Sequence, residues 1–102
     1  MLIKCKSKGS AVLVQLMGEL DHHSAKEVKD QLELYLRDSN VKDLILDFEQ
    51  LRFMDSSGIG VLIGRYNTLK KRNGQMAVVN VNKQVDKIMT ISGLYRIIKK
   101  IS

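Results

Sequence analysis

The stretch Asp55-Ser56-Ser57-Gly58-Ile59-Gly60 concentrates three polar side chains and two glycines. Asp and Ser are favoured at the start of a helix, where one side chain accepts a hydrogen bond from a free backbone N–H. One cap needs only one such residue, so capping leaves a serine hydroxyl unexplained. A hydroxyl there is well placed to carry a phosphate, because the free N–H groups and the helix dipole favour negative charge. The residues alone leave open whether Ser56 or Ser57 would carry it.

A serine nucleophile is the alternative chemistry for Ser56. The nucleophile elbow of hydrolases has glycine two residues before the serine, where this chain has Met54. The only histidines, His22 and His23, are adjacent in sequence, so their side chains should point apart and make a poor metal site. Asp47 lacks the acidic pair and the later lysine that a phospho-accepting receiver aspartate requires. We therefore expect no catalytic residue, no metal site and no cofactor.

Apolar periodicity predicts strands that alternate with helices. Strands are expected at 2–6, 11–17, 44–48 and 75–81, and helices at 24–37, from about 55 to 73, and from 82 to about 92. Segment 97–101 fits either a strand or a helix. Strands 11–17 and 44–48 are nearly all apolar, which is typical of strands covered on both faces. Ser24 and Glu27 have the spacing of a capping box, and Asn82 is expected to cap the third helix.

This order predicts a single α/β domain over residues 1–102, with an opening β-hairpin, a mixed and mostly parallel sheet, and helices packed on it. In such sheets functional groups gather where strands end and helices begin. Two predicted junctions, 19–23 and 54–58, are rich in polar residues. If their parent strands are adjacent and parallel, both junctions lie at one edge. Asp21 could then hold a local turn, cap the first helix, or lie near Ser56.

The composition narrows the class of partner. The chain has 17 Lys and Arg against 11 Asp and Glu, a net charge of +6, but the basic residues are spread along it. It has no Trp and few other aromatic residues, which argues against a base-stacking platform. An acidic protein partner is therefore the better interpretation than a nucleic-acid-binding domain, although a solvated basic surface without a partner explains the charge equally well.

The cysteine content and the lengths of the apolar runs predict the cellular compartment. Cys5 is the only cysteine, so no internal disulfide can form. No apolar run is long enough to span a bilayer, and three lysines in the first eight residues are unlike a signal peptide. We expect a cytoplasmic protein without membrane insertion.

Three stretches resemble the STAS domain family and, within it, the anti-sigma-factor antagonists of the SpoIIAA type. They are 18–23 (GELDHH), 53–66 (FMDSSGIGVLIGRY) and 92–94 (SGL). The resemblance implies that the unphosphorylated protein binds an anti-sigma factor that is also a serine kinase, and so frees a sporulation sigma factor. That kinase would phosphorylate the serine directly after the aspartate, Ser56, and switch binding off. A membrane-associated PP2C-type phosphatase would restore the active form.

The resemblance also implies where the partner binds. The expected surface comprises Asp21, His22, His23, Asp55, Ser56, Ser57, Gly58 and Ile59. It implies neither an enzymatic activity of this chain nor direct contact with nucleic acid. A general stress-response pathway is the alternative to sporulation.

Overall fold

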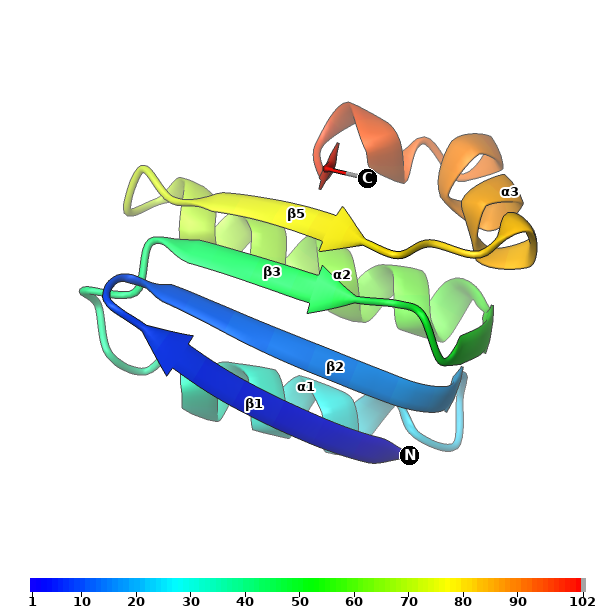
Figure 1. Ribbon diagram of the computed structural model, residues 1–102, viewed down its shortest axis with the longest axis horizontal. Coiled ribbons are helices and arrows are strands. Elements are labelled where there is room, and N and C mark those ends of the chain that lie inside the picture. Colours follow the sequence, from blue (N-terminus) through cyan, green and yellow to red (C-terminus); the bar gives the residue numbers. More distant parts are fainter. Residues whose placement is uncertain (102) are drawn as a thin grey trace.

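The computed structural model describes residues 1–101 and has a two-layer α/β architecture (Figure 1). The elements are β1 (Leu2–Lys8), β2 (Ala11–Leu20), α1 (Ala25–Tyr35), β3 (Asp43–Asp47), β4 (Leu51–Met54), α2 (Ser56–Lys70), β5 (Gln75–Val79), α3 (Lys83–Ile91), a 3-10 turn (Leu94–Arg96) and β6 (Lys99–Lys100). The strand order is β1-β2-β3-β5-β6, with β4 beside β2. Only β1 is antiparallel to its neighbour. The predicted α/β class and mixed, mostly parallel sheet are confirmed.

The helices cover one face of the sheet, not both. In Figure 1, α1 and α2 lie behind the sheet, and the face toward the viewer is open. Alternate residues of β2, such as Val12 and Val14, are buried against the helices, whereas Leu13 between them is 37% exposed. The expectation that strands 11–17 and 44–48 are covered on both faces is therefore wrong. The polar residues Gln15 and Asp47, which lie opposite each other on the open face, were the signal for this.

A short strand that the sequence analysis did not predict decides how the chain approaches α2. Strand β4 pairs in parallel with the end of β2, after a register shift between Gly18 and Glu19. Residues 18–20 are therefore strand, and the junction predicted over 19–23 leaves the sheet only at Asp21. Four residues containing an exposed arginine are too short and too irregular to show a clear period of two.

Of the two helix caps predicted from the sequence, one is confirmed and one is wrong. Asn82 caps α3 as expected, and its side chain accepts a hydrogen bond from the Val85 N–H at 2.9 Å. Ser24 precedes α1, but its side chain makes no capping hydrogen bond, so the predicted capping box is wrong. The hydroxyl of Ser24 instead donates to the Glu19 carbonyl at 2.7 Å, which ties the helix start back to β2. Segment 97–101, left undecided, contains β6 after a 3-10 turn.

The glycines of α2 differ in what surrounds them. A Cβ at Gly58 would lie 2.5 Å from the Leu20 carbonyl oxygen and 2.8 Å from the side chain of Met54. At Gly60 and Gly64 it would meet nothing within 4 Å. Close packing therefore explains Gly58 and not the other two.

A matched pair of substitutions tests this packing. Gly58→Ala should lower the free energy of unfolding by about 1–3 kcal/mol, because the helix start must move away from β2. Gly60→Ala should raise it by about 0.5–1 kcal/mol, since alanine is the better helix former and has open space. Urea unfolding of both variants checks this, and effects of the same sign would contradict it.

Candidate functional site

The two polar junctions predicted from the sequence lie side by side. Strands β2 and β4 are parallel neighbours that end together, with Leu20 opposite Met54. The Asp55 N–H then donates to the Leu20 carbonyl at 3.2 Å. Residues 19–23 and 55–59 therefore form one surface, which we call the junction edge. They meet as expected, although the parent strand of the second junction is β4 and not the strand at 44–48.

The carboxylate of Asp55 links both halves of the junction edge. One oxygen, Oδ1, accepts hydrogen bonds from the N–H groups of Ser57 at 2.9 Å and Gly58 at 3.2 Å, and so caps α2. The other, Oδ2, accepts from the N–H of His22 at 3.0 Å, across 33 residues of chain. Desolvation opposes ionisation, but the three N–H donors outweigh it and hold the pKa of Asp55 below its ordinary value.

Asp21 shapes the other half of the edge. Its Oδ1 accepts hydrogen bonds from the N–H groups of His23 at 2.9 Å and Ser24 at 3.2 Å. Its own N–H donates to the Ser24 hydroxyl at 3.1 Å. Of the three roles considered for Asp21, holding a local turn is the one these bonds describe. The turn leaves the side chains of His22 and His23 exposed, and their rings meet edge to face with centroids 5.6 Å apart, so the expectation that they point apart is wrong.

The two serines occupy different environments. Ser56 is the first residue of α2 and is exposed, whereas Ser57 is half-buried. Both oxygens of the neighbouring Asp55 accept hydrogen bonds from backbone N–H groups, and the lowered pKa that results makes this carboxylate a weak base for the Ser56 hydroxyl. The arrangement leaves Ser56 as an accessible hydroxyl at a helix start. Such a position can accept a phosphate from another enzyme.

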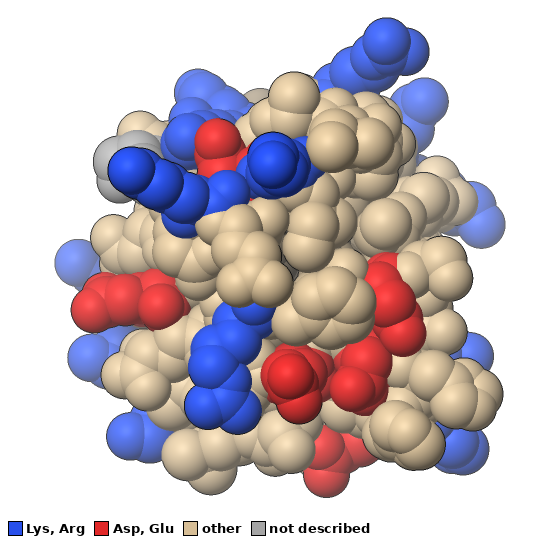
Figure 2. Space-filling model, turned by 90° about the vertical axis from the view of Figure 1, so that its right-hand side faces the viewer, with Lys and Arg blue, Asp and Glu red and all other residues tan. Residues whose placement is uncertain are grey.

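Acidic side chains gather on the face that carries the junction edge, although the chain as a whole is basic (Figure 2). A hollow of about 560 Å³ opens there. Its lining includes Met1, Glu19, Asp21, Glu27 and Arg52. The Met1 amino group lies 3.9 Å from the Glu27 carboxylate, at the side of this hollow. A partner that binds here meets mainly acidic side chains, together with Arg52 and the Met1 amino group.

Sequence reasoning missed two exposed apolar side chains beside these residues. Phe53 on β4 is 39% exposed, and Ile63 on α2 is 40% exposed. Phe53 was overlooked because β4 was not recognised. The helical spacing of Ile59, Leu62, Ile63, Tyr66 and Leu69 predicts one buried face, and this is wrong for Ile63. By contrast, Gly58 is buried beneath the edge.

Over residues 1–101, no three His, Cys, Asp or Glu side chains come together as ligands for a metal ion. In the same range, no helix has the length and apolar character needed to cross a membrane.

Removing the Asp55 carboxylate should loosen both junctions at once. For Asp55→Ala we expect a loss of about 1 kcal/mol in stability, typical of a lost cap. We also expect faster amide hydrogen exchange at His22, because its acceptor is gone. Asp21→Ala is the comparison, since it removes the acceptor for the His23 and Ser24 N–H groups but keeps the Asp55 acceptor for His22. Unchanged exchange at His22 in Asp55→Ala would show that the bond does not hold the loop.

The lowered pKa of Asp55 predicts a pH dependence. A carboxyl group with a lower pKa in the folded state adds stability above its unfolded value of about 3.9, and this stability is lost as pH falls through the folded pKa. The stability difference between the wild type and Asp55→Asn should therefore shrink between about pH 5 and pH 2. Urea titrations at several pH values measure it, and a constant difference would contradict the assignment.

Known proteins are similar to this chain in sequence and in fold. The STAS domain family model matches residues 3–102. The chain is 37% identical over 95 residues to an anti-sigma F factor antagonist of Paenibacillus polymyxa, covering 93% of this chain and 81% of that protein. It is 28% identical to the anti-sigma-B factor antagonist of Bacillus subtilis, covering 94% and 86%.

Solved structures of anti-sigma factor antagonists have a fold similar to that of this chain. The structure of the Bacillus cell fate determinant SpoIIAA in its phosphorylated form has a TM-score of 0.76 and 28% identity, over 99% of this chain and 92% of that one. The unphosphorylated form of the anti-sigma factor antagonist SpoIIAA has a TM-score of 0.73, over 88% and 83%. The family match over nearly the whole chain, the identity to these antagonists and the shared fold lead to one conclusion: the chain belongs to the STAS domain family.

Proposed function

We propose that this protein is an anti-sigma-factor antagonist. Its unphosphorylated junction edge binds an anti-sigma factor that is also a serine kinase, and this binding frees a sporulation sigma factor. The observation that carries the proposal is the position of Ser56, exposed at the first residue of α2 in the middle of that edge. The relatives named as anti-sigma F factor antagonists, at 37% and 34% identity, support it.

Phosphorylation of Ser56 by that kinase is the proposed off-switch. A phosphate adds about two negative charges and three acceptor oxygens at this position. The N-terminus of α2 tolerates the charge, so the domain stays folded. The surface around it is already acidic, and a bulky anion there changes both the shape and the charge that the partner meets. Binding is then lost while the fold persists.

The proposed contact surface comprises the exposed and half-exposed residues of the junction edge other than Glu19. These are Asp21, His22, His23, Asp55, Ser56, Ser57 and Ile59. Gly58 is buried beneath this surface, where the absence of a side chain lets α2 begin directly against β2. Phe53 and Ile63 supply exposed apolar area next to it. Exposed apolar area beside polar groups is a usual feature of a protein-binding surface.

A phosphatase of the PP2C type completes the proposed cycle by removing the phosphate. This protein itself catalyses no step of it and contacts no nucleic acid. A general stress-response pathway is the second candidate, supported by relatives named as anti-sigma-B factor antagonists. Recovery of the unphosphorylated protein with its partner from its own cells, followed by identification of the released sigma factor, distinguishes the two.

The phosphorylation site is tested with the cognate kinase and ATP. Mass spectrometry should find one phosphate on the wild type and on Ser57→Ala, and none on Ser56→Ala. Ser56→Asp should keep the melting temperature of the wild type but bind the kinase at least about tenfold more weakly, a difference of about 1.4 kcal/mol. Phosphate on Ser56→Ala would move the site elsewhere, and full binding by Ser56→Asp would refute the switch.

A further inference from the structure

The open face of the sheet carries an apolar row with a lysine at each end. Residues that lie opposite one another on adjacent strands share a face. The strand register places in one row Lys6 of β1, Leu13 of β2, Ile45 of β3, Ala77 of β5 and Lys99 of β6. The two lysines are exposed, and the three apolar side chains form a continuous strip between them.

The surface is hollowed along this row. One hollow of about 470 Å³ is lined by Lys4, Cys5, Lys6, Leu13, Gln15 and Asp47. A second of about 220 Å³ includes Ile45, Ala77, Lys99 and Ile101 in its lining. Leu13 and Ile45 are direct neighbours in the register, so the two hollows adjoin. No helix covers this face in Figure 1.

We propose that this row docks an amphipathic helix of a partner protein, apolar in its middle and acidic at both ends. Adjacent strands are about 4.8 Å apart, so the row from Lys6 to Lys99 spans about 19 Å. A helix rises 1.5 Å per residue, and about 13 residues cover that length. Carboxylates at its two ends then face the two lysines, and its apolar side chains rest on Leu13, Ile45 and Ala77.

The charges act against a second copy of this chain paired along the edge of the sheet. Lys4, Lys6 and Lys8 alternate along the edge strand β1 and point to the open face, opposite Gln15, Leu13 and Ala11. A second copy paired along this edge would bring two such lysine columns together. Exposed lysines of this kind act against edge pairing.

The shape of the face also disfavours a lipid surface. Insertion into a bilayer needs apolar side chains that protrude beyond their polar neighbours. Leu13 is 37% exposed, but Ala77 is only 8% exposed and Ile45 is half-buried, so two of the three apolar side chains lie below the lysines. A recessed strip fits an inserted side chain of a partner.

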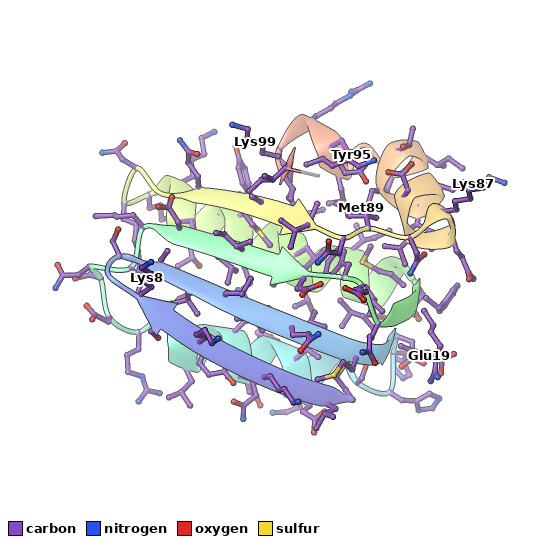
Figure 3. All side chains as sticks on the ribbon, in the orientation of Figure 1. Lys8, Glu19, Lys87, Met89, Tyr95 and Lys99 are labelled. Carbon is purple, nitrogen blue, oxygen red and sulfur yellow. The ribbon has the colours of Figure 1, made fainter. Side chains whose placement is uncertain are left out.

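This face is remote from the junction edge. Leu13 precedes Leu20 by seven residues of β2, about 23 Å along the strand. In Figure 3, Lys8 and Glu19 likewise lie at opposite ends of the sheet. Screening limits the reach of a surface charge to about 8 Å at physiological salt. Docking on the face is therefore independent of a phosphate on Ser56, and it goes beyond the proposed switch.

A defined peptide tests the proposal. The probe is a capped helix of about 13 residues with leucine and alanine in its middle and two glutamates at each end. On titration into the isotope-labelled full chain, amide signals of Leu13, Ile45 and Ala77 should shift. The double variant Lys6→Glu/Lys99→Glu should weaken binding about tenfold or more, and Leu13→Gln should weaken it as well. The control Lys71→Glu/Lys87→Glu makes the same change in net charge on exposed lysines outside the row.

The outcomes separate the alternatives. Equal weakening by the control variant, or shifts confined to other surfaces, would overturn the proposal. So would equal binding of a peptide with lysines at its ends, or a concentration-dependent dimer that the row variants abolish. Binding to vesicles with anionic lipid, without binding to the peptide, would assign the face to a membrane instead. Ser56→Asp should bind the probe as the wild type does, whether or not the proposed switch is correct.

Discussion

Both halves of the junction edge depend on hydrogen bonds to the carboxylate of Asp55. One oxygen caps α2 and the other holds the His22 N–H of the preceding junction. The bonds require β2 and β4 to end at the same level, which the pairing of Leu20 with Met54 provides. They also require α2 to begin close to β2, which the absence of a side chain at Gly58 permits. Ser56 therefore projects from a surface whose backbone is held on both sides.

Because helices cover only one face of the sheet, the domain has a second sheet face that is not part of its core. The core lies between that face and α1 and α2, so the opposite face need not be fully apolar, and it carries lysines and aspartates among its apolar residues. The ends of the parallel strands carry the junction edge. The edge and the open face are therefore separate surfaces of one small domain, and one can change its charge without altering the other.

Much of the fold was predictable because its main elements have strong local signals. The alternation of strand and helix, the start of α2 after Asp55 and the cap at Asn82 follow from periodicity and capping preferences, which depend on residues close in sequence. Strand β4 was not predictable in this way. Its four residues are stable as a strand because the end of β2 offers free backbone groups, and that partner lies more than 30 residues earlier.

The sequence by itself determined that a serine hydroxyl stands at a helix start, and its likeness to a known family favoured Ser56 over Ser57. Tertiary structure decided that the two junctions meet, that Asp55 joins them, and that Gly58 is buried while Ile63 is exposed. The physical reason is the range of the interactions. Capping and helical periodicity act within a few residues, whereas the bond from His22 to Asp55 and the covering of one sheet face depend on how distant segments pack.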